Sequence, residues 1–329
     1  MIWMTLAIAL LQDPPKMADN SETMKKVGWI VGAWSGAGES KELGKYTDDV
    51  TFEWTLNKNF LKVGETVRGA KGVIWHSTGL LGWDCAKKQF TWFQFGLDGT
   101  VGWCRTADDK VDGTIVMDGR LTGGGPFSDF RTTWKKTGDG AMNNTVEIRN
   151  EKKELTPFVS TDYKKLEKPA AAKAVDFKDE GRLKGFEWMI GTWTGSGEME
   201  GFGKYEDEYK IEWSHGGNFI KSSYWMRAGG KEVWHDTGMI GWDADKKKFI
   251  GVNFGMDGTI GWGEGVGATD DMKTLTFEGE TVGPNENVKF RASMKKGEGA
   301  TMVVVCEQKD GDKWKAYGPE RTMTHEKVK

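Results

Sequence analysis

A motif that occurs twice in this chain sets the unit in which its fold must be considered. WHSTGLLGWD begins at Trp75 and WHDTGMIGWD begins at Trp234, and each is followed at the same distance by the tripeptide DGT. From residue 25 to residue 103 the first half aligns with the second without a gap. Repetition at this spacing indicates a duplicated unit, so the 329 residues are expected to form two domains of ordinary size.

Each half is expected to consist mainly of β-strands. The chain has 17 Trp and 46 Gly, which suits short aromatic strands joined by tight turns. The clearest period-two pattern covers residues 46–54, where large side chains alternate with polar ones, and it returns at residues 205–213. One face of this strand is therefore predicted to be buried, and Glu53 and Glu212 are predicted to lie on the solvent side.

The strands of each half are predicted to close into a barrel. Each half offers about nine or ten strands, linked mainly by hairpins, and no helix long enough to cover a sheet. The Asp-Gly pairs at 98–99 and 257–258 favour tight turns because glycine accepts the positive φ that such turns require. A twisted sheet of this size avoids open edges by closing on itself. The predicted fold class is all-β, with two tandem up-and-down antiparallel β-barrels.

The repeat and two stretches without a strand pattern give the predicted boundaries. Residues 1–22 hold an apolar run that is too short to span a bilayer as a helix, so we expect a signal peptide and N-terminal segment. Residues 23–167 are assigned to the first barrel, 168–182 to a linker and 183–329 to the second barrel. The expected location is the periplasm or the extracellular space. The alternative is a cytoplasmic protein whose N-terminus is a buried strand.

Composition and motifs exclude several functional classes. The net charge of −3 comes from intermixed acidic and basic residues without a basic run, so nucleic acid is not an expected partner. The sequence has no GxSxG, HExxH or CxxC motif, so neither an enzyme nor a metal site is expected. The two halves share none of the three cysteines, and packed free thiols are expected. A bridge between Cys85 and Cys104 is the alternative in an exported protein.

Positions that keep a polar or aromatic side chain in both halves are the candidates for a ligand site. They are a tryptophan that shares its strand face with two glycines, an arginine near a strand end, the only matched histidine, and an amide among apolar neighbours. A buried amide needs a partner or a ligand, and an inward arginine could hold a carboxylate. The candidate ligand-binding residues are Trp34, Arg68, His76 and Gln94 in the first half, and Trp193, Arg227, His235 and Asn253 in the second.

Each candidate also has a structural explanation. The tryptophans can be core residues, since large aromatic side chains bury much apolar area. The arginines can form ion pairs at the surface. Both faces of the histidine strand carry mixed side chains, so a structural histidine and a cavity histidine stay open.

Several motifs resemble those of known families. GxWxGxGE at residue 32, GWDxxKKxF, the DGT hairpin and LTFEGE at 275–280 are similar to a bacterial family of unknown function with lipocalin-like, calycin-type barrels. This resemblance implies one barrel per half and no established activity. A more distant likeness is to the nitrobindin family of haem-binding barrels, and it implies that His76 and His235 line a cavity near Gln94 and Asn253.

The nitrobindin likeness also implies a histidine on the haem iron in a strand near the C-terminus of each barrel. Residues 142–150 and 302–308 contain no histidine. No cofactor is therefore predicted, and haem is kept as the alternative.

The leading functional hypothesis is an exported, non-enzymatic protein whose barrels bind a small apolar or amphipathic molecule. Stable insertion into a membrane is not expected, and the sequence gives no oligomeric state. One alternative is haem chemistry on nitrogen oxides. Another is a glycan- or protein-interaction module that uses the surface tryptophans Trp92, Trp225 and Trp314.

Overall fold

The computed structural model divides the chain into two compact units, and each is described by itself. The predicted signal peptide and linker lie mainly outside the residues that the structure describes, and both stay predictions. The described ranges are 19–123, 128–169, 181–199, 203–268, 271–284, 287–317 and 320–326.

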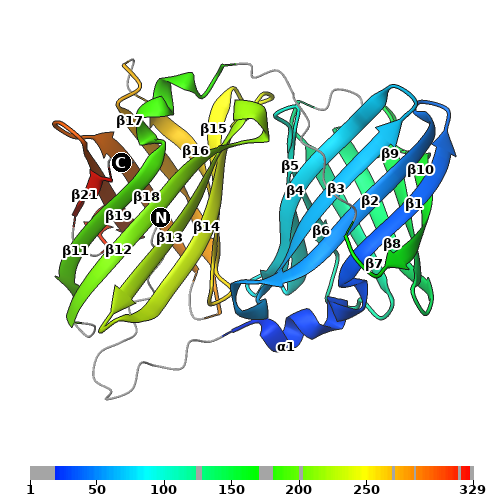
Figure 1. Cartoon of the computed structure of the whole chain (residues 1–329), viewed down its shortest axis with the longest axis horizontal. Coiled ribbons are helices and arrows are strands. Elements are labelled where there is room, and N and C mark those ends of the chain that lie inside the picture. The colour runs from blue at the N-terminus through cyan, green and yellow to red at the C-terminus, as the bar shows by residue number, and fades with distance from the viewer. Residues whose placement is uncertain are drawn as a thin grey trace. The chain divides into compact units, whose positions relative to one another are not determined.

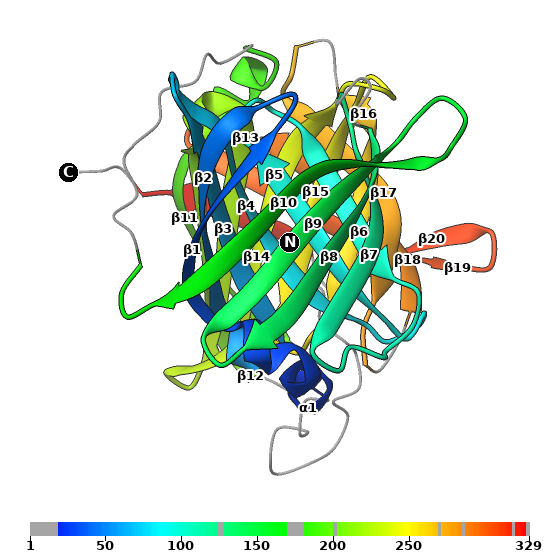
Figure 2. The same cartoon turned by 90° about the vertical axis from the view of Figure 1, so that its right-hand side faces the viewer.

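The first unit contains a closed barrel of ten antiparallel strands (Figure 1). Each strand pairs with its neighbours in sequence, and β1 pairs with β10 to complete the ring. Figure 2 shows β7 to β10 running side by side and inclined, as closure of a sheet requires. The strands are β1 (Gly32–Ser40), β2 (Gly44–Thr55), β3 (Phe60–Gly69), β4 (Gly72–Asp84), β5 (Gln89–Gly96), β6 (Val101–Thr106), β7 (Thr114–Leu121), β8 (Asp129–Gly138), β9 (Ala141–Arg149) and β10 (Leu155–Leu166).

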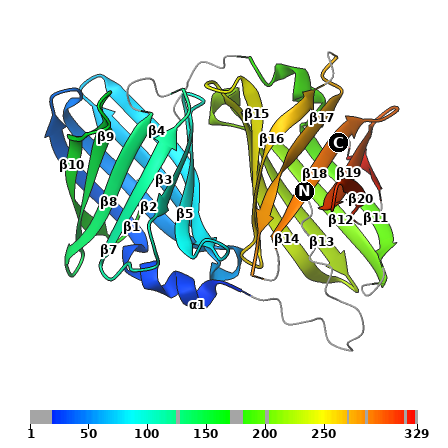
Figure 3. The same ribbon diagram turned by 180° about the vertical axis from the view of Figure 1, so that it is seen from behind.

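The second unit repeats this ring with one addition. β11 pairs with β21 and β18 pairs with β19, which closes ten strands, while β20 pairs with β19 as a hairpin extension (Figure 3). The strands are β11 (Gly191–Met199), β12 (Gly203–Ser214), β13 (Phe219–Ala228), β14 (Lys231–Asp243), β15 (Lys248–Gly255), β16 (Ile260–Ala268), β17 (Thr274–Val282), β18 (Asn287–Lys296), β19 (Thr301–Asp310), β20 (Lys313–Ala316) and β21 (Arg321–His325). The predicted fold class, two tandem antiparallel barrels, is confirmed.

Alternation of side chains along β2 decides which residues face the barrel interior. Tyr46, Val50 and Phe52 are buried and Glu53 is exposed, as the period-two pattern predicts. Asp48 belongs to the same inward face and is only 4% exposed. The pattern therefore brings a carboxyl group into the barrel together with the aromatic residues.

Short helices plug one end of each barrel. In the first unit α1 (Ser21–Met24) leads into a 3-10 helix, η1 (Lys25–Ile30), which places Met24, Val27 and Ile30 in the core. Each fully buried side chain of this size contributes about 1.5–3 kcal/mol. η4 (Lys184–Met189) has the same place before the second barrel. Two further 3-10 turns follow β2 and β12, namely η2 (Leu56–Lys58) and η5 (His215–Gly217).

Two smaller features complete the fold. None of the three cysteines, all of them described, forms a disulfide, and Cys104 lies in the first core with its Sγ 3.7 Å from Met117 Sδ. In the described part of the chain, none of the helices combines the length and hydropathy needed to cross a bilayer.

Candidate functional site

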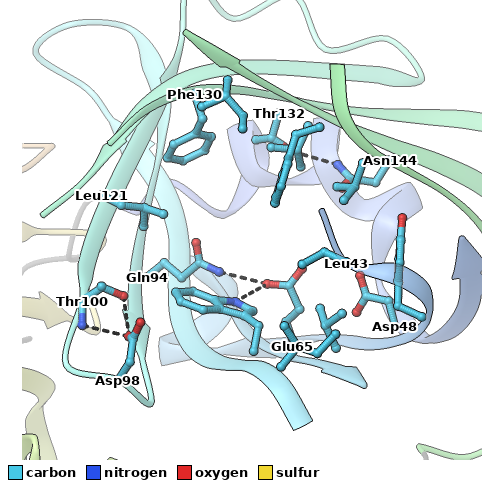
Figure 4. A pocket seen from close by; sticks show the side chains of 18 of the residues that line it. Leu43, Asp48, Glu65, Gln94, Asp98, Thr100, Leu121, Phe130, Thr132 and Asn144 are labelled. Carbon is cyan, nitrogen blue, oxygen red and sulfur yellow. Dashed lines mark hydrogen bonds between the residues drawn. The ribbon is translucent and has the colours of Figure 1, made fainter. Parts of the chain in front are cut away.

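The first barrel encloses a cavity of about 430 Å³ (Figure 4). β1 starts directly after the plug, so the turn at Leu43 that follows it lies at the opposite end of the barrel, as do the turns at Asp98 and Gly123. These three residues line the cavity, which therefore opens at the end that the plug leaves free. Its aromatic lining consists of Tyr46, Trp75, Trp92, Phe130, Trp134 and Phe158.

Glycines on the inner face give the large rings their space. A Cβ at Gly79 would lie 2.6 Å from Nε1 of Trp92, so the indole crosses the strand where a side chain is missing. The glycines after Trp34 act in the same way, because a Cβ at Gly38 would meet the Tyr46 hydroxyl group. Tyr46 from β2 therefore fills the space beside these glycines.

Glu65 on β3 is the centre of a hydrogen-bonded cluster in the cavity wall. Its Oε2 accepts hydrogen bonds from Trp75 Nε1 (3.1 Å), Ser77 Oγ (3.3 Å) and Gln94 Nε2 (3.0 Å). Gln94 also donates to Ser77 at 2.7 Å. All three bonds arrive at one oxygen, and Oε1 accepts none from the described residues. Burial raises the pKa of the Glu65 carboxyl group.

Asp48 is the second carboxyl group in this interior, and Figure 4 shows it on the same wall as Glu65. Its Oδ2 accepts a hydrogen bond of 2.5 Å from the hydroxyl group of Tyr163. Its Oδ1 is buried and has no hydrogen-bond partner among the described residues. Burial, and then the nearby charge of Glu65, hold the pKa of Asp48 well above its usual range. None of the described residues that line the cavity carries a positive charge.

The second barrel keeps the same donors but moves the carboxylate by one strand. Trp234 and Asn253, which match Trp75 and Gln94, donate to Asp236 at 2.8 and 2.9 Å. Asp236 is directly opposite Tyr224 in the strand register, as Ser77 is opposite Glu65. One cross-strand pair thus carries the carboxylate in both barrels, on β3 in the first and on β14 in the second.

The second barrel also contains an internal cation. Arg321 is only 8% exposed, and its Nη1 lies 3.1 Å from the Tyr224 hydroxyl oxygen and 3.9 Å from Asp207 Oδ2. Arg321 is opposite Val304 in the register, the place that Thr161 takes opposite Asn144 in the first barrel. The charge of Arg321 lowers the pKa of Asp207, although burial, the larger effect, keeps it raised.

The structure brings four of the eight candidate residues into a barrel interior. Gln94 lies in the wall of the first cavity, and Asn253 is buried in the second barrel against Asp236. Trp34 and Trp193 are buried at the plugged ends of the two barrels, where their indole nitrogens donate to the carbonyl oxygens of Ile30 and Met189. These two hydrogen bonds tie the first strand of each barrel to its plug.

The matched histidines and arginines alternate with the inward residues of their strands, so in each barrel they lie on the outer face of the sheet. His76 Nδ1 lies 2.9 Å from Thr66 Oγ1, and His235 stacks on Trp225 with ring centroids 4.9 Å apart. Arg68 pairs with Asp49 at 2.6 Å, and Arg227 approaches Glu208 to 3.6 Å. Arg227 also lines a hollow of about 620 Å³ with the residues Ser196, Gly197, Glu198, Lys204, Tyr205, Glu206, Gly229 and Gly230.

Two acidic residues of the site are absent from the sequence predictions, although a signal existed for both. Asp48 is separated by an even number of residues from Tyr46 and Val50, so it lies on the same buried strand face. Glu65 lies in the same way on the face of Val63 and Val67. Trp92, predicted at the surface, is 5% exposed and lines the cavity. In the described part of the chain no three His, Cys, Asp or Glu side chains form a group suited to a metal ion.

The whole chain shows low similarity to known proteins. No protein-family model matches it, and no curated protein matches it. Among solved structures, Rv2717c from M. tuberculosis is similar at 15% identity with a TM-score of 0.36, over 44% of this chain and 97% of that one. A protein of unknown function from the DUF3598 family of Nostoc punctiforme is similar at 13% identity with a TM-score of 0.26, over 93% of this chain and 99% of that one. No functional inference follows from similarities at this level.

Proposed function

We propose that the first barrel binds a small amphipathic molecule in its cavity. The observation that carries the proposal is an unfilled interior of about 430 Å³ with aromatic walls and unpaired polar atoms. Binding sites for small molecules are typically apolar hollows with a few polar groups that fix orientation. Export, suggested by the apolar N-terminal run, is part of the same proposal.

Three buried polar atoms support a ligand with polar groups of its own. Asp48 Oδ1, Trp92 Nε1 and Trp134 Nε1 belong to residues that line the cavity, and none has a partner among the described residues. A buried polar group without a hydrogen bond costs about 1–3 kcal/mol. A ligand that pairs with these atoms recovers part of that cost.

The proposal assigns binding to the first barrel because the second has larger side chains at matched inward positions. Tyr224 and Met226 stand where the first barrel has Glu65 and Val67. Arg321 stands in the place of Thr161 and reaches Tyr224. Transfer of these residues into the first barrel is expected to fill its cavity.

The test uses prodan, a neutral fluorophore whose emission shifts to the blue in apolar surroundings. We expect the wild-type protein to bind prodan, and the double variant Glu65→Tyr/Thr161→Arg to bind it at least ten-fold more weakly. Thr156→Arg makes the same change at an exposed position of β10 and is the matched control. Circular dichroism checks that the variants fold. Absence of prodan binding to the wild type, or equal binding to the filled variant, would overturn the proposal.

A further inference from the structure

The interior of the first barrel holds two carboxyl groups with no basic side chain among the described residues that line it. Asp48 and Glu65 share one wall of the cavity, and the mouth adds Asp98. None of the described lining residues is a lysine, an arginine or a histidine. Buried carboxylates in proteins are normally paired with a cation, because an isolated buried charge is costly.

The second barrel shows how the same scaffold places a cation beside an internal carboxylate. Asp207 matches Asp48, and Asp236 replaces Glu65 as the acceptor for the tryptophan and the amide. Arg321 supplies the positive charge, with its guanidinium carbon 5.9 and 6.0 Å from the ring centres of Tyr205 and Tyr224. In the first barrel the matching residue is Thr161, whose hydroxyl group pairs with the Tyr46 hydroxyl group at 2.9 Å.

The free acceptor atoms lie where such a cation would be needed. Asp48 is only 4% exposed, yet its Oδ1 has no hydrogen-bond partner among the described residues. Glu65 Oε1 likewise accepts no hydrogen bond from them. The faces of indole and phenol rings attract cations. Tyr46 and Trp75 line the cavity, and Trp75 donates its indole hydrogen bond to Glu65. The remaining lining, around Phe130 and Trp134, is apolar enough for a hydrocarbon group.

We infer that the ligand of the first barrel is an organic cation, an amine or ammonium compound. Its charged nitrogen lies against Asp48 and Glu65 and its apolar part lies along the tryptophans. This inference rests on the proposed function, since it names the chemical class of the molecule in the same cavity. In this arrangement the ligand supplies the charge that Arg321 supplies in the second barrel.

Three probes of equal chain length separate charge from apolar contact: octylamine, octanol and octanoate. We expect octylamine to bind the wild-type protein at least ten-fold more tightly than octanol, measured by calorimetry and by displacement of prodan. Octanoate is expected to bind more weakly than octanol. In Asp48→Asn/Glu65→Gln, which keeps the shape of both side chains, octylamine is expected to fall to the affinity of octanol while prodan binding is retained. The matched control is Asp207→Asn in the second barrel, which should leave the preference for octylamine unchanged.

The possible results separate this inference from the proposed function. Equal binding of octylamine and octanol with prodan still bound, or an octylamine preference that survives in the double variant, overturns the organic cation but leaves a binding cavity. If prodan and all three octyl compounds fail to bind, the proposed function falls and the inference falls with it.

Discussion

At the scale of single residues, Asp48 and Glu65 are the unusual elements of this protein. Most buried carboxylates are ion-paired, whereas these two rely on hydroxyl, indole and amide donors. Tyr163 pairs with only one oxygen of Asp48, and the other is buried without a partner among the described residues. The ligand-free barrel therefore gives up stability to keep these groups inside.

The Asp48→Asn variant tests this cost through pH. Because the folded-state pKa of Asp48 lies above its unfolded value, folding favours the protonated form, and the wild type loses stability as pH rises from about 4 through the folded-state pKa. We expect Asp48→Asn to match the wild type near pH 4 and to be more stable by roughly 1–3 kcal/mol at pH 8. Urea unfolding measured across this range gives the comparison. Glu53→Gln, on the exposed face of the same strand, is the control, and an Asp48→Asn variant less stable than wild type at pH 8 would contradict the argument.

Parity along a strand predicts the direction of these residues, but the sequence does not show why a carboxyl group points inward. The same alternation that correctly places Glu53 in solvent also places Asp48 inside. Burial preferences oppose that assignment, since acidic residues are rarely buried. His76 shows the reverse case: both faces of β4 are mixed in character, so only the closed barrel shows that Trp75 and Ser77 face inward.

At the scale of elements, the helical plug makes the two ends of the first barrel different. η1 enters the core through Val27 and Ile30, and Trp34 on β1 donates to the Ile30 carbonyl oxygen at 2.7 Å. The sequence predicts this short helix and the strand after it. It does not predict that Trp34 belongs to the plug, because that depends on how far the helix reaches under the barrel.

The Met24→Ala variant tests the contribution of the plug. Met24 is fully buried in the first core, and removal of such a side chain costs about 2–5 kcal/mol. Hydrogen exchange should therefore speed up in peptides from residues 20–166 and stay unchanged in those from residues 183–325. Lys25→Ala removes an exposed ion pair with Glu22 and should cost less than about 1 kcal/mol. Equal effects of the two variants would mean that the plug is not part of the first core.

At the scale of the whole molecule, a duplicated sequence has produced two barrels with the same strands and different interiors. The repeat predicts the ring, because matched positions share hairpins, glycines and alternation. It does not predict the cavity, because the cavity volume is the small difference between two large volumes. These are the volume enclosed by the strands and the total volume of the inward side chains. The second barrel has Arg321 at the position of Thr161 and Tyr224 at the position of Glu65. These larger side chains change the unfilled volume without changing the fold.

The contrast between the barrels predicts that a ligand stabilises only one of them. At a ligand concentration one hundred times its dissociation constant, the free energy of unfolding of the binding unit rises by about 2.7 kcal/mol. Saturating octylamine should slow hydrogen exchange in peptides from residues 32–166, with no change in residues 191–325. Protection of both barrels, or of the second alone, would contradict the assignment of the cavity to the first.

Because the first barrel has one open end and one plugged end, its affinity for a ligand should depend on the length of the ligand's alkyl chain. An apolar tail held at the carboxyl groups can extend only until the wall is covered, and each further methylene group must then leave through the mouth beside Leu43 and Phe158. Affinity along a series of alkylamines would rise by about 0.8 kcal/mol per buried methylene group and then level off without collapsing. The barrel would thus set a lower limit on the size of its best ligands and leave the upper limit free.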